Sequence, residues 1–172
     1  MLKIIEDSLD NIFFILINNN EKYILPTLKS RCLKFKINFT FDETIKICDQ
    51  ILNDKTLNLI SDQLISTYNT PGEIINLIKF ANDKNLNLKN YTLYGFLNLL
   101  IKNGYYKKNK FVKDLLINFI ELFFLKEYKC TSSKNSLIDF YHIFINKIYN
   151  VEKFNLDEES LFLEFRSKLL NG

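Results

Sequence analysis

The segment 111–128 carries apolar residues on nearly every face of the helix that its pattern predicts. A helix that is apolar all round has to be buried among other elements. We therefore expect a central helix, and periodicity predicts helical neighbours at about 92–102, 136–149 and 157–170. The apolar positions of the central helix are Phe111, Val112, Leu115, Leu116, Phe119, Ile120, Phe123 and Phe124.

Three shorter helices are predicted between residues 40 and 81. Thr40 and Glu43 have the spacing of a capping box, which predicts a helix from there to about Leu52. A second helix is expected to carry four apolar residues at helical spacing, and Thr70-Pro71-Gly72-Glu73 predicts the start of a third. The polar segment 82–90 is typical of a linker, and we place a domain boundary there. The apolar residues of the second helix are Leu57, Ile60, Leu64 and Ile65.

The first 38 residues have a different pattern. An unbroken apolar run at 12–17 predicts a strand that is covered on both faces. The segment 32–37 alternates apolar and basic residues, which is typical of a half-exposed edge strand. Two strands make an incomplete sheet, so we interpret residues 1–38 as the last part of an α/β domain. The expected fold class is mainly α, with a remnant of an α/β core that holds one or two strands.

The composition excludes several functional classes. The longest apolar candidate, 115–125, contains Asn118 and Glu121, and no run reaches the roughly 20 residues that cross a bilayer. The N-terminus becomes acidic at Glu6, too early for a secretory signal. We expect a soluble cytoplasmic protein without a membrane partner. A formal net charge of +3 is too small to indicate nucleic-acid binding by itself.

Residues for independent catalysis are missing. The chain has no GxxxxGK[ST] phosphate loop and no GxSxG motif. Three widely spaced cysteines and a single histidine, His142, do not form a metal or redox motif, so we expect no metal and no cofactor. Buried free thiols and a packed or half-exposed His142 are the simpler interpretation. We do not expect the chain to be an enzyme on its own.

Arg31 is the most informative charged residue. It lies in Ser30-Arg31-Cys32, at the end of a loop that Pro26 is expected to kink, and its guanidinium offers a planar fork of donors that suits phosphate. From the residues alone, a solvent-exposed arginine at the end of a loop is the better explanation, because surface arginines are common.

The surrounding motifs resemble the clamp-loader subunits of bacterial DNA polymerase III, which are AAA+ proteins. The strand Phe14-Ile15-Leu16 is followed by Leu25-Pro26-Thr27 and Ser30-Arg31-Cys32, similar to the family pattern LPxTIxSRC. The resemblance implies that Arg31, with Ser30 and Cys32 in its loop, is an arginine finger acting in trans on a neighbour's ATP. It also implies that Asn18 is at the sensor-1 position. The likeness is strong over 2–37, moderate over the next fifty residues and only architectural beyond residue 90.

The third predicted helix indicates which type of subunit the chain resembles. ATP-binding gamma/tau-type subunits carry a sensor-2 arginine in this region, whereas Asn69-Thr70-Pro71-Gly72-Glu73 has none and is similar to the GSPG motif of delta-prime subunits. The resemblance implies an AAA+ remnant at 1–38, a three-helix lid at 39–89 and a helical collar at 90–172. The nucleotide-binding loop of the family would precede Met1.

The implied function is that of a non-catalytic subunit of a DNA-directed DNA polymerase holoenzyme, which takes part in loading the sliding clamp during DNA replication. Its partners would be gamma/tau and delta subunits, contacted through the collar and the Ser30-Arg31-Cys32 loop. Two alternatives stay open: a fragment of a gamma/tau-type subunit, or a stand-alone helical module that binds nucleic acid. The second would use 105–110, where two tyrosines lie among lysines and DNA phosphate is the expected contact.

Overall fold

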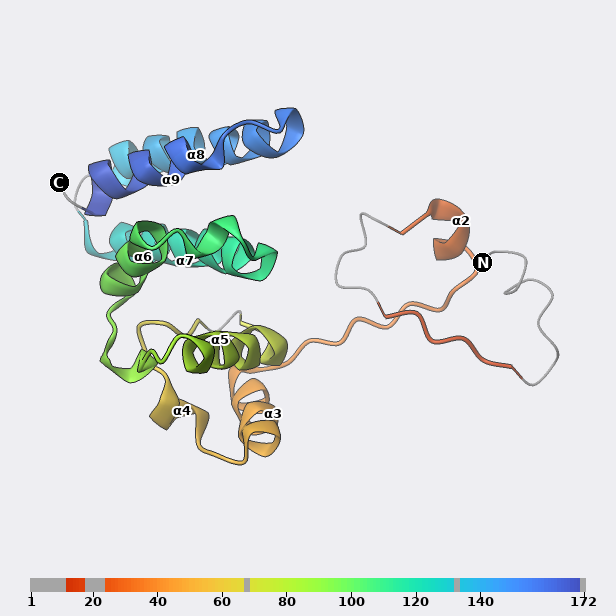
Figure 1. Ribbon diagram of the computed structural model, residues 1–172. Helices are drawn as coiled ribbons and strands as arrows, with labels where there is room; N and C mark the ends of the chain where they lie inside the picture. Colours follow the sequence, from red (N-terminus) through yellow and green to blue (C-terminus); the bar gives the residue numbers. More distant parts are fainter. Residues whose placement is uncertain (1–11, 18–23, 67–68, 132–133, 171–172) are drawn as a thin grey trace. The chain divides into compact units, whose positions relative to one another are not determined.

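The computed structural model describes residues 12–17, 24–66, 69–131 and 134–170 (Figure 1). The chain divides into two compact units, Met1–Asn38 and Phe39–Gly172. The described residues are mainly helical, which confirms the expected fold class at that level. The first unit contains α2 (Pro26–Lys29). The second contains α3 (Phe41–Leu52), α4 (Thr56–Leu59), α5 (Pro71–Asp83), η2 (Leu88–Asn90), α6 (Leu93–Lys102), η3 (Tyr105–Lys107), α7 (Lys110–Cys130), α8 (Lys134–Phe154), α9 (Glu158–Phe165) and η4 (Arg166–Leu170).

The two strands expected in the first unit are absent from the described residues. Both 12–17 and 33–38 lack regular secondary structure, and their side chains are exposed, with Phe13 at 91% and Leu33 at 88%. A strand exists only where its backbone groups pair with a neighbouring strand. Neither segment has such a neighbour within the described part of the chain, so the prediction of strands was wrong for this structure.

Two capping boxes begin helices where the sequence predicted them. The Thr40 hydroxyl accepts from the Glu43 amide at 3.3 Å, and the Glu43 carboxylate accepts from the Thr40 amide at 2.8 Å. Thr70 and Glu73 repeat this arrangement at the start of α5, with the same two distances. These reciprocal bonds satisfy amide donors that the first turn of a helix leaves unpaired.

The second helix of this region is much shorter than expected. It ends at Leu59, and the segment 60–66 turns without helix while burying Ile60 and Leu64. Partners distant in sequence replace its helical hydrogen bonds. The Ser61 amide donates to the Leu88 carbonyl at 3.3 Å, and Lys126 donates to the Gln63 carbonyl at 2.9 Å.

The segment 82–90, expected to be a linker, is mostly exposed, but Leu88 and Lys89 contact the rest of the second unit. Leu88 is 3% exposed. The Lys89 ammonium donates to the carbonyls of Leu57 and Ile60, at 2.8 and 3.4 Å. These bonds hold η2 against the α4 turn.

The remaining helices agree with the predicted periodicity, although α7 and α8 extend further than expected. The buried residues of α7 recur at intervals of three and four, so they lie on one broad face of the helix, whereas Asn118, Glu121 and Leu125 are exposed. The expectation that α7 is buried all round was therefore wrong. Gly104 follows α6 with a φ of 61°, a conformation that glycine adopts without strain. One continuous apolar core runs from Ile45 to Phe165 and includes residues of α3, α5, α6, α7, α8 and α9.

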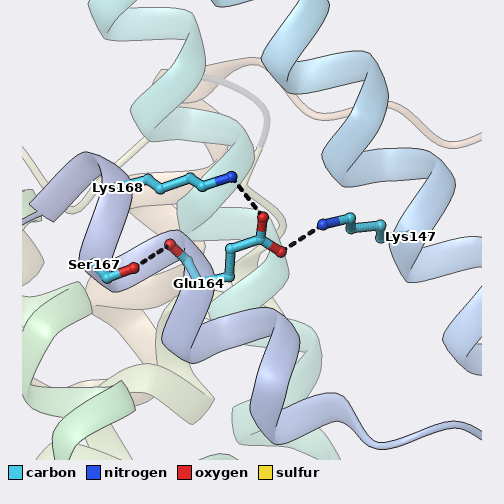
Figure 2. A network of polar contacts seen from close by, with 4 residues as sticks. All are labelled: Lys147, Glu164, Ser167 and Lys168. Atoms are coloured by element: carbon cyan, nitrogen blue, oxygen red, sulfur yellow. Dashed lines mark hydrogen bonds and ion pairs between the residues drawn. The ribbon is translucent and has the colours of Figure 1, made fainter.

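Glu164 joins α8, α9 and η4 through charged hydrogen bonds (Figure 2). Its carboxylate accepts from Lys147 of α8 and, at 2.7 Å, from Lys168 of η4. Its backbone carbonyl accepts from the Ser167 hydroxyl at 3.1 Å. The two lysine side chains lower the pKa of the Glu164 carboxyl.

Candidate functional site

The residues around Arg31 form a helical turn and not the open loop that Pro26 suggested. Pro26 is the first residue of α2, where its missing N–H costs no helical bond. The amides of Leu28 and Lys29 both donate to the Leu25 carbonyl, at 3.0 and 3.1 Å. The Arg31 amide donates to the Leu28 carbonyl at 3.1 Å, so the arginine directly follows the turn.

Arg31 has an exposed side chain that is held at the end of this turn. Its Nη1 donates to the Thr27 carbonyl at 3.0 Å, and the Ser30 hydroxyl donates to the same carbonyl at 3.0 Å. Cys32 is half-buried beside them. Asn18, the expected sensor-1 residue, lies outside the described residues. The structure therefore describes three of the four predicted site residues. Two of them, Ser30 and Arg31, donate hydrogen bonds to the same backbone carbonyl.

The cysteines and the histidine have ordinary environments. Cys48 is buried near the Pro71 carbonyl, and burial raises the pKa of its thiol. Cys130 is exposed, so the expectation of buried thiols was wrong there. His142 is exposed on α8, with its ring 6.1 Å from that of Tyr141. Across the described ranges, no three acidic, cysteine or histidine side chains form a group that could hold a metal.

The tyrosine- and lysine-rich segment is largely engaged within the protein. Tyr106 is buried, with its ring 4.7 Å from that of Phe162, and it is not accessible for stacking on a base. Lys107 forms an ion pair of 2.6 Å with Glu159, and this hydrogen bond raises the pKa of the lysine. The neighbouring Tyr105 packs edge-on against Phe80. The segment thus attaches α9 and α5 to the turn after α6.

A groove between α7 and α8 was not predicted from the sequence. It encloses about 240 Å³, and its lining is apolar except for one carboxylate and two phenolic hydroxyls. The sequence held one signal for it, because Glu121 interrupts an otherwise apolar stretch of the central helix. The lining residues are Glu121, Phe124, Leu125, Tyr128, Leu137, Ile138 and Tyr141.

Comparisons of the chain with family models, with curated proteins and with solved structures gave no match. Within the described part of the chain, every helix is too short or too polar to cross a bilayer.

Proposed function

We propose that the chain belongs to a delta-prime-like subunit of a bacterial clamp loader, in which Arg31 completes the ATPase site of a neighbouring subunit. The observation that carries the proposal is the exposed guanidinium of Arg31, held by the Thr27 carbonyl at the end of α2. Such tethering supports the proposal because it restricts the side chain before any nucleotide arrives. A group restrained in this way loses less conformational entropy on binding.

The chemistry of arginine fits this role. Phosphoryl transfer develops negative charge on the oxygens of the γ-phosphate, and a guanidinium supplied in trans stabilises that charge. The chain's own residues would position this cation and would not hydrolyse ATP. Its sequence holds no phosphate-binding loop, and α5 holds no arginine that would act as a sensor-2 residue.

The start of α5 is compatible with a subunit that does not bind nucleotide. Thr70 and Glu73 are used in a capping box, and the space around Gly72 is open, with no atom within 4 Å of a Cβ built there. Residues 39–89 would then be a lid without a nucleotide contact. Residues 90–172 would be the collar that contacts gamma/tau and delta subunits, and DNA would be reached through the assembled loader.

The test is Arg31→Ala in a loader reconstituted with the ATP-binding subunits encoded by the same genome. We expect ATP turnover stimulated by clamp and primed DNA to fall by about tenfold or more at the site that Arg31 completes. Arg31→Lys keeps the charge but loses the planar fork, so it should restore only part of the activity.

Lys34→Ala is the matched control, since it removes an exposed positive charge three residues away. It should leave both assembly and stimulated turnover unchanged. An Arg31→Ala loader that assembles and hydrolyses ATP at the full rate would contradict the finger role. A phosphate-binding loop in the coding sequence before Met1 would favour the gamma/tau alternative.

A further inference from the structure

The groove between α7 and α8 presents a continuous apolar surface to solvent. Leu125, Tyr128 and Ile138 are 43, 40 and 37% exposed and all line it. Glu121, Leu125 and Tyr128 are spaced by four and three residues, so they lie along one face of α7. A run of exposed apolar side chains around a hollow indicates an interaction surface.

The size of the groove favours side chains over a cofactor. Sites for cofactors and drug-sized ligands enclose roughly 300–1,000 Å³, and this groove encloses about 240 Å³. That volume suits a few aliphatic side chains. Its walls are two helices, and grooves of this type bind amphipathic helices through apolar residues one turn apart.

The charge in the groove specifies the ligand further. Glu121 is the only lining residue with a formal charge, and among the described residues no Lys or Arg forms an ion pair with it. Glu121 is exposed, and partial desolvation by the apolar walls raises the pKa of its carboxyl group. The pKa of the Tyr141 hydroxyl is raised by burial and, second, by the charge of Glu121. A purely apolar ligand would remove the carboxylate from water without compensation, which is unfavourable. A ligand that carries a cation next to its apolar groups would pair with it.

We propose that the α7–α8 groove binds an amphipathic helix of a partner protein, with aliphatic side chains against Leu125 and Ile138 and a Lys or Arg paired with Glu121. This inference concerns the second unit alone. It does not require that Arg31 acts on ATP.

The test is a selection of helical peptides from a phage-displayed library on the full-length chain. We expect the enriched peptides to carry two aliphatic residues one helical turn apart with Lys or Arg beside them. Binding of the best peptide, measured by fluorescence polarisation, should weaken about tenfold or more in Glu121→Lys. Replacement of the peptide's cation by Glu should restore binding to that variant.

Glu127→Lys is the matched control, because Glu127 is exposed on the same helix but does not line the groove. It should bind the original peptide as the unmodified chain does. Ile138→Ser should weaken binding, and its circular dichroism spectrum and melting temperature would show that it folds.

Three results would overturn the proposal: no enrichment, enrichment without a cation, or binding that Ile138→Ser and Glu121→Lys leave unchanged. Sedimentation supplies a further check. A dimer of the chain that Ile138→Ser dissociates would mean that a second copy occupies the groove, which also contradicts a partner helix.

Discussion

Glu164 shows how one side chain contributes to stability at the scale of a single residue. Its pKa is lowered by hydrogen bonds from Lys147 and Lys168. A lowered pKa means that the folded state favours the charged carboxylate more than the unfolded state does. The stabilisation is therefore present above the usual pKa of 4.5 and is lost as the pH falls through the lower value of the folded protein.

We expect Glu164→Gln to lower the free energy of unfolding at neutral pH by at most about 1 kcal/mol, since both lysines are partly exposed. Urea denaturation at pH 7 and at pH 3 would measure it. The difference in free energy of unfolding between Glu164→Gln and the unmodified chain should be smaller at pH 3, because the carboxylate becomes protonated there. Glu127→Gln is the control for the loss of an exposed glutamate on a helix. A loss of stability in Glu164→Gln that is equal at both pH values would contradict the ion-pair explanation.

Arg31 was predicted to be a site residue from its chemistry and from the motif around it, and this stays a prediction. The tether to the Thr27 carbonyl was not predicted, because Pro26 in a short segment indicated a loop. Proline is equally compatible with the first position of a helix. The four backbone bonds around α2 distinguish the two conformations, and the segment has no side-chain cap that would have indicated a helix start.

The stability of a single helix depends on the hydrogen bonds of its first turn, and α5 offers the clearest test of this dependence. Thr70→Ala removes the acceptor for the Glu73 amide and should lower the free energy of unfolding by about 1 kcal/mol. Thr70→Ser keeps a hydroxyl in the same place and should retain most of the stability. Chemical denaturation of the three proteins would measure this, and equal stability of all three would show that the cap contributes nothing.

Helix starts were predicted correctly because their causes are local. Thr40 and Thr70 lie three residues before the glutamates that complete their boxes. The segment 60–66 was not predicted, since its backbone partners come from Leu88 and Lys126, far away in the sequence. The groove was missed for the same reason: neither α7 nor α8 alone contains it.

At the scale of the whole molecule, the apolar core is confined to the second unit. The buried core residues of the described chain run from Ile45 to Phe165. We therefore expect a protein of residues 39–172 to fold alone, with the melting temperature of the full chain. It should also aggregate less, because it lacks the exposed apolar segment 12–17.

Thermal unfolding followed by circular dichroism would test this expectation. A matched truncation to residues 39–156 removes the buried Phe162 and Phe165 and should melt at a clearly lower temperature. A large loss of stability on removal of residues 1–38 would mean that the first unit supports the helical core.

The backbone at the end of the first unit and the start of the second has a consequence for proteolysis. Residues 33–40 are exposed and without helix, and they include Lys34 and Lys36. Trypsin needs an exposed, unfolded stretch around a basic residue, so brief digestion should cut here before it cuts within the helices. Mass spectrometry should find a resistant fragment beginning at residue 35 or 37. One scission would then leave Arg31 and α2 on a short peptide, severed from the helices of the second unit.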